Sequence, residues 1–115
     1  MEHAMPYDHN LAERIRAKLK TYPNIVEKKI FGGVGFLIHG NLACGVHEDD
    51  MIVRVGNENN APALAQPFVR QFMPMPGKPM EGWILVAPQG LEAEANLHHW
   101  AELGYEYASK LPEKK

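Results

Sequence analysis

Three glycines, Gly32, Gly33 and Gly35, form the segment whose spacing comes nearest to a ligand-binding loop. A dinucleotide site needs Gly-x-Gly-x-x-Gly leading into a helix, and a P-loop ends in Gly-Lys-Ser/Thr. Here the next glycine, Gly40, follows Gly35 after four residues that have the pattern of a strand. Nucleotide binding is therefore a minority interpretation. We predict a bend, a bulge or a close backbone crossing in the sheet.

Arg54 is the second candidate, because it lies between Val53 and Val55 in an apolar run. Its guanidinium could pair with a carboxylate, anchor a turn through backbone carbonyl groups, or bind an anionic ligand. Structural pairing is favoured, and anion binding is the alternative. If the chain binds a small ligand, the predicted binding residues are Gly32, Gly33, Gly35, Arg54 and Trp83.

Side chains that could act as nucleophiles, bases or metal ligands are scattered. Cys44 has no nearby cation or helix N-terminus that would lower its pKa, so a buried structural thiol is expected. His98 and His99 are adjacent and would point about 100° apart on a helix, which hinders chelation of one metal. Ser109, the only serine, lacks a hydrolase motif. We expect no catalytic residue, metal or cofactor, although a metal site from distant residues and a Cys44–histidine pair stay open.

Length, charge and cysteine content limit the class of protein. A chain of 115 residues, 45% of them hydrophobic, is expected to form a single domain over residues 1–115. Its net charge of −2 gives no general affinity for polyanions, so direct nucleic-acid binding is not expected. A lone cysteine and the lack of an apolar run of ~20 residues favour a reducing, cytoplasmic location away from the membrane.

The charges are nevertheless uneven along the chain. Six basic residues fall early, namely Arg14, Arg16, Lys18, Lys20, Lys28 and Lys29, and four glutamates fall near the end, at 92, 94, 102 and 106. A basic early face could contact an acidic partner. An ordinary solvated helix face is the more frequent origin of such a pattern.

The order of elements predicts a two-layer α+β domain. A helix is expected from about His9, capped by Asp8 and ended before Pro23. Strands are expected at 25–31, 36–38, 42–46, 51–55 and 82–87, with 68–75 as an edge strand or loop, a short helix at 61–66, and a last helix opening at 88–90. This order indicates an antiparallel sheet of about five strands with the N- and C-terminal helices packed on one face. The other face can stay open to solvent or a partner.

The last helix has a predicted inner stripe that includes several small residues. Gly104 is one of them, and glycine inside a helix costs ~1 kcal/mol relative to alanine. A close packing contact is the expected compensation. The full stripe is Ala93, Leu97, Trp100, Ala101, Gly104, Ala108 and Leu111.

Four segments resemble the TfoX N-terminal domain family, the TfoX/Sxy group. They are KIFGG at 29–33, GNLACGV at 40–46, MIVRVG at 51–56 and GKPMEG at 77–82. LHHW at 97–100 and SKLP at 109–112 also fit, so the resemblance runs from about the first helix to Pro112. Ile30 and Lys78 depart mildly from the family, which more often has Met and Arg there.

The resemblance implies an α+β domain with an antiparallel sheet, similar to the secretion-chaperone arrangement, and an association with regulation of bacterial natural competence. Full-length regulators continue into a C-terminal helical domain, so this chain, which ends at Lys115, is expected to be a stand-alone N-terminal domain. The family pattern supplies no catalytic residues. The expected function is a non-enzymatic regulatory or adaptor domain that binds another protein, with a homodimer left open. The alternative is a small-ligand or anion-binding module.

Overall fold

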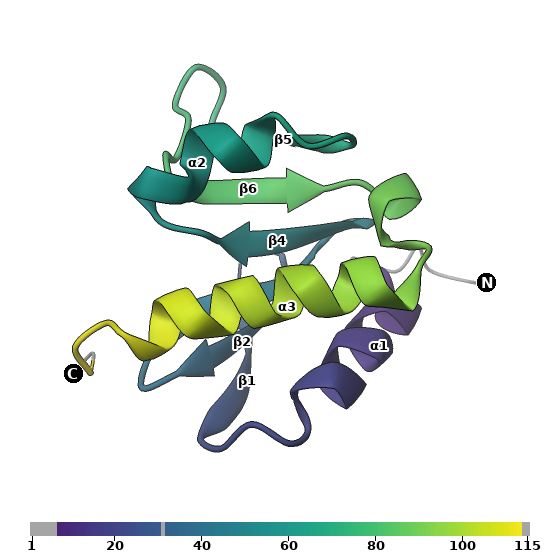
Figure 1. Ribbon diagram of the computed structural model, residues 1–115, viewed down its shortest axis with the longest axis vertical. Helices are drawn as coiled ribbons and strands as arrows, with labels where there is room; N and C mark the ends of the chain where they lie inside the picture. Colours follow the sequence, from purple (N-terminus) through teal and green to yellow (C-terminus); the bar gives the residue numbers. More distant parts are fainter. Residues whose placement is uncertain (1–6, 31, 114–115) are drawn as a thin grey trace.

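The computed structural model describes residues 7–30 and 32–113, which contain a six-stranded antiparallel sheet, two long helices, one shorter helix and a 3₁₀ turn. Helices α1 (His9–Leu19) and α3 (Glu94–Ser109) lie over one face of the sheet (Figure 1). The strand order is β1–β2–β3–β4–β6–β5. In chain order the strands are β1 (Ile25–Ile30), β2 (Gly33–Ile38), β3 (Asn41–His47), β4 (Asp50–Arg54), β5 (Val69–Gln71) and β6 (Trp83–Val86). The predicted α+β class, with both terminal helices on one face, is confirmed.

Helix α1 begins and ends where local chemistry predicts. The Asp8 carboxylate accepts a hydrogen bond of 3.1 Å from the backbone N–H of Leu11, which caps the helix. The chain leaves the helix before Pro23, whose ring cannot continue it. The residues of α1 buried in the main core are Leu11, Ala12, Ile15 and Leu19.

Gly33 and Gly35 belong to strand β2 and do not form the predicted bulge, whereas Gly32 lies in the turn before the strand. Gly33 and Gly35 pair regularly with β1, and the register shift of β2 lies between Phe36 and Leu37. A Cβ atom at Gly33 would lie 1.9 Å from the carbonyl oxygen of Val46 in β3. The predicted close approach of another backbone is therefore confirmed. The predicted strand at 25–31 is seen as β1, with residue 31 outside the described residues.

The face of the sheet away from α1 and α3 carries a second apolar cluster. Its buried members, each no more than 5% exposed, are Leu42, Ile52, Phe72 and Leu85. Four half-buried side chains pack around them, namely Ile30, Leu37, Met80 and Trp83. The centre of this face is thus closed to solvent, in contrast with the open face that the sequence suggested.

Helix α2 spans Asn57–Leu64 and so begins before the predicted range of 61–66. The side chain of Asn60 explains the difference, because it is only 8% exposed and fully engaged. Its Oδ1 accepts hydrogen bonds from the Gly82 N–H at 2.8 Å and from the Gln71 Nε2 at 3.1 Å. These tertiary contacts fix α2 against β5 and β6.

The second half of the chain closes the sheet and returns to α3. The short strand β5 forms one edge, as predicted, and β6 lies between β5 and β4. The last helix begins later than predicted, because Pro88–Leu91 forms a separate 3₁₀ turn, η1, and α3 starts only at Glu94. The hydrogen bond from the Gly90 N–H to the Ala87 carbonyl closes this tighter turn.

Gly104 is the place where α3 comes closest to the sheet. A Cβ atom there would lie 2.2 Å from the carbonyl oxygen of Ala43 in β3, so the predicted packing contact is confirmed. Of the predicted stripe, Ala93 is exposed and Leu111 is half-buried beyond the helix. The buried members are Leu97, Trp100, Ala101, Gly104 and Ala108.

Candidate functional site

The five predicted binding residues do not form one site. In the sheet register, Val34 of β2, Val46 of β3 and Met51 of β4 lie in one row. Gly33 precedes this row by one residue, whereas Arg54 follows it by three and lies two strands away. The two are therefore separated by about 13 Å along the strands and about 10 Å across them.

The space around the glycines is already filled. A Cβ atom at Gly35 would lie 2.6 Å from the Cδ1 atom of Ile30 and 2.7 Å from that of Leu42. Gly32 has open space around it and a φ angle of 73°, so it serves the turn into β2. In this structure the glycines of β2 allow strand β3 and neighbouring side chains to pack closely, so no space for a ligand is left between β2 and β3.

Arg54 and Trp83 do meet, because they are cross-strand partners in β4 and β6. The Cζ atom of Arg54 lies 5.1 Å from the centre of the Trp83 ring and 5.6 Å from that of Tyr107 in α3. Among the described residues, no carboxylate or carbonyl oxygen bonds to this guanidinium. The favoured ion pair is therefore not seen. Two aromatic rings contact the guanidinium where a carboxylate was expected.

Cys44 is buried in β3, and burial raises the pKa of its thiol to about 12. A thiol with such a pKa is almost entirely protonated at neutral pH, so it is a poor nucleophile. In the part of the chain that the structure describes, no group of three His, Cys, Asp or Glu side chains is placed to hold a metal ion.

A groove that the sequence did not reveal lies between α1 and β1. Its volume is about 540 Å³. Leu19 and Phe36, each no more than 2% exposed, form its floor, and half-buried Tyr22 and Ile25 line it near the chain connection. The ring of Tyr22 is held by stacking on Tyr105 of α3, with ring centres 4.2 Å apart. The groove therefore has an apolar interior that is fixed by the main core.

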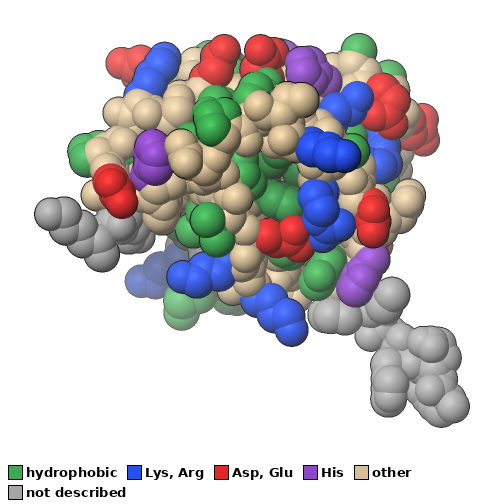
Figure 2. Space-filling model, turned by 90° about the horizontal axis from the view of Figure 1, so that it is seen from below, with side chains coloured by type: hydrophobic (Ala, Val, Ile, Leu, Met, Phe, Trp, Pro, Cys, Tyr) green, Lys and Arg blue, Asp and Glu red, His purple; other side chains and the backbone are tan. Residues whose placement is uncertain are grey.

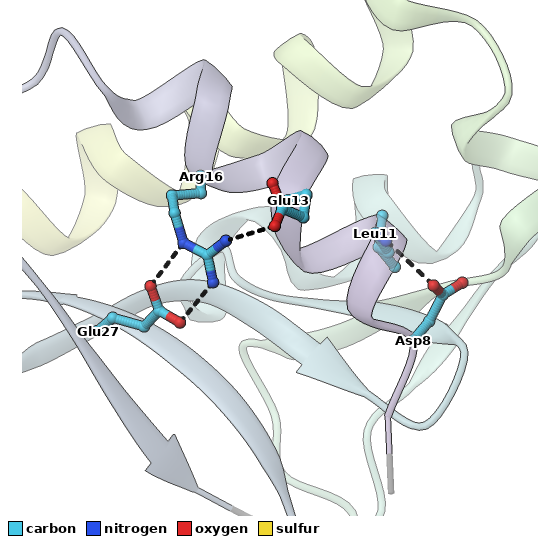
Figure 3. A network of polar contacts seen from close by, with 5 residues as sticks. All are labelled: Asp8, Leu11, Glu13, Arg16 and Glu27. Atoms are coloured by element: carbon cyan, nitrogen blue, oxygen red, sulfur yellow. Dashed lines mark hydrogen bonds and ion pairs between the residues drawn. The ribbon is translucent and has the colours of Figure 1, made fainter. Parts of the chain in front are cut away.

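One ion pair spans this groove from α1 to β1 (Figure 3). The guanidinium of Arg16 donates two hydrogen bonds to the carboxylate of Glu27, from Nε at 2.8 Å and from Nη2 at 2.7 Å. Its Nη1 atom lies 3.6 Å from Glu13. The hydrogen bonds from Arg16 lower the pKa of Glu27 below the ordinary glutamate value. Both acidic side chains that line the groove are thus engaged by one arginine.

The basic residues of the early cluster divide into a paired and an unpaired group, and Arg16 belongs to the paired group through Glu27. On the side of α1 toward α3, Lys18 and Arg14 pair with Glu94 at 3.2 Å and 3.0 Å and lower the pKa of that carboxyl. Lys20, Lys28 and Lys29 are exposed, and no described carboxylate pairs with them. Figure 2, viewed from the side of α1 and β1, shows hydrophobic side chains in a hollow bordered by charged ones. Of these three lysines only Lys20 lines the groove, and Lys28 and Lys29 lie at the β1 edge. Glu102 and Glu106 of α3 lie near Tyr22, because burial and then these negative charges raise the pKa of its hydroxyl.

Strand β1 forms the edge of the sheet beside this groove. It pairs with β2 alone among the described strands, and its middle residues, 26–29, are exposed. Val26 is 60% exposed on the face away from the helices. The outer row of backbone N–H and C=O groups of β1 can therefore accept a further strand.

A family model described as the TfoX N-terminal domain matches residues 17–108. The chain belongs to this family. The match begins inside α1 and ends near the last turn of α3, so it includes every strand of the sheet and most of the residues that line the groove. No curated protein and no solved structure matches the chain significantly. In the described part of this TfoX N-terminal domain, no helix is long and apolar enough to cross a membrane.

Proposed function

We propose that this TfoX N-terminal domain is a non-enzymatic adaptor that acts by binding another protein. One observation carries the proposal: the apolar α1–β1 groove lies directly beside an unpaired edge strand. A free strand edge offers backbone hydrogen bonds, and an adjacent groove offers pockets for alternate side chains, which is how strand-addition modules bind their partners. A regulatory role in competence or transcription is the form of this function that the family resemblance suggests.

Site-specific photocrosslinking in the source cell tests this function. A photoreactive benzoylphenylalanine replaces Ala17, which is exposed and lines the groove. The matched control places the same group at Glu58, which is exposed in α2 beside the opposite edge of the sheet. We expect a protein adduct from Ala17 that is missing from Glu58, with its identity read by mass spectrometry. A second copy of the chain in the adduct would make the interaction a homodimer. No adduct at Ala17, or equal adducts at both positions, would refute binding at this groove.

A second function, anion binding, is favoured by Arg54. Its guanidinium is oriented by two aromatic rings and has no acidic partner among the described residues, so its N–H groups could bind an oxyanion. Inorganic phosphate, compared with sodium chloride of equal ionic strength, is the probe. At 100 times Kd it should stabilise the fold by about 2.7 kcal/mol. The Arg54→Gln variant should lose this effect, and equal stabilisation by both salts would refute it.

A further inference from the structure

We propose that the edge of β1 and the α1–β1 groove bind an extended acidic segment of another protein, which adds to the sheet as a seventh, antiparallel strand. This inference rests on the proposed protein-binding function and names the surface and the chemistry of its partner. It begins from the two faces of β1. Ile25, Glu27 and Lys29 lie on the groove side, while Val26 and Lys28 lie on the other side.

The lysines at the edge of β1 select an acidic partner. Inside the groove the two cations, Arg16 and Lys20, balance the two carboxylates, Glu13 and Glu27, so the preference for an acidic partner comes from the lysines of β1. Lys28 and Lys29 on β1, like Lys20 at the C-cap of α1, have no described acidic partner. Carboxylates placed opposite the two β1 lysines would form cross-strand ion pairs, each of which stabilises paired strands modestly.

The order of residues along β1 predicts the order in the partner. Opposite Lys29 and Lys28 we expect two acidic residues, one on each face of the sheet. Opposite Val26 and Ile25 we expect two apolar residues, of which the second would enter the groove beside Tyr22. An antiparallel partner would therefore read acidic, acidic, any residue, apolar, apolar. Antiparallel addition also continues the pattern of every neighbouring strand pair in the described sheet.

A second copy of this chain fits the edge less well. Two β1 strands related by a two-fold axis perpendicular to the sheet would place one residue directly opposite its own copy. In the middle of β1 that residue is Glu27 or Lys28. Like charges directly opposite one another destabilise paired strands, and lysines on an edge strand oppose such self-association. The charges that hinder self-pairing are those that an acidic strand would neutralise.

The test adds a seven-residue peptide with blocked ends, Gly-Glu-Glu-Thr-Val-Val-Gly, to the whole chain and monitors binding by backbone NMR. We expect chemical-shift changes and slowed amide hydrogen exchange that are confined to β1 and the groove. The affinity of the Lys29→Glu variant should be about tenfold lower than that of the wild type. The affinity of the wild type itself should fall in high salt, because salt screens the attraction between its lysines and the acidic peptide. Lys78→Glu is the matched control, because it makes the same charge change at an exposed position in the turn beyond β5. Unchanged thermal stability of both variants shows that the fold is retained.

Two further peptides identify the binding mode. Gly-Lys-Lys-Thr-Val-Val-Gly should bind at least tenfold more weakly, and equal binding would overturn the choice of an acidic partner. Gly-Glu-Glu-Pro-Val-Pro-Gly cannot donate a full set of ladder hydrogen bonds, and equal binding would overturn strand addition. If no peptide binds but Ala17 still crosslinks to a different protein, the acidic-strand inference fails while the adaptor function stands. If neither occurs, both fail.

Discussion

Replacement of Gly104 by alanine separates the effect of helix propensity from that of helix–sheet packing, because the two predict opposite signs. In an isolated helix this change would stabilise by about 1 kcal/mol. In the folded protein the new Cβ atom would lie 2.2 Å from the Ala43 carbonyl oxygen, against a practical minimum of 3.0 Å. Helix α3 must then move by at least 0.8 Å, which is the difference between these distances. The obstacle is the backbone of β3, which is hydrogen-bonded on both sides and cannot easily yield.

The expected result is a net loss of stability. Overpacking a well-packed interior costs about 1 to 3 kcal/mol, and a backbone obstacle places this case near the upper end. Subtraction of the propensity gain leaves a destabilisation of about 2 kcal/mol, or a fall in Tm of about 8 °C for a domain of this size. Urea denaturation and calorimetry measure it. Ala95→Gly, at an exposed position in the first turn of the same helix, is the control and should cost less than the ~1 kcal/mol of an interior position. Unchanged or increased stability of Gly104→Ala would refute the packing argument.

Three other predictions concern charge and reactivity. Arg16 lowers the pKa of Glu27 in the folded protein. The stability that this ion pair contributes is therefore present above the ordinary glutamate pKa and is lost as the pH falls through the lowered pKa of the folded state. Between about pH 7 and pH 3, wild type should therefore lose more stability than Glu27→Gln, by less than about 1 kcal/mol in urea titrations, and identical losses would contradict this. Cys44 should resist iodoacetamide at about pH 8 in the folded protein and react in guanidinium, as read by mass; fast native alkylation would contradict its burial and raised pKa. A double-mutant cycle of Arg54→Met and Tyr107→Leu should give a coupling of about 0.5 to 1 kcal/mol, and additive effects would mean that the ring contact contributes nothing.

The elements that the sequence predicted well are those specified by neighbouring residues. Helix α1 depends on the Asp8 cap, an apolar stripe at helical spacing and a proline after its end, all within a short stretch. The hairpin between β2 and β3 likewise depends on His39 and Gly40, which both adopt positive φ. Glycines in β2 indicated a close backbone contact, although only the fold shows that Val46 provides it.

The elements that were missed depend on residues far apart in the chain. The start of α2 is fixed by the bonds of Asn60 to Gln71 and Gly82, and a polar run read alone favours a loop. The α1–β1 groove depends on the angle at which α1 crosses the sheet, which local patterns do not determine. The early basic cluster was the one feature of the sequence that pointed to this surface. Its division into paired and unpaired residues required the position of Glu94, which is 76 residues further along the chain than Lys18.

The two edges of the sheet are protected in different ways, and this difference argues for β1 as the binding edge. Strand β5 has three residues, and Pro67 and Pro74 near its ends limit the backbone donors available to a partner. Strand β1 has six residues without proline, and its protection is the charge of Lys28 and Lys29. A short edge bounded by prolines remains a poor template for any added strand. Protection by charge is selective, because a strand of opposite charge removes it, and the edge that resists self-association is then the one that can accept a complementary partner.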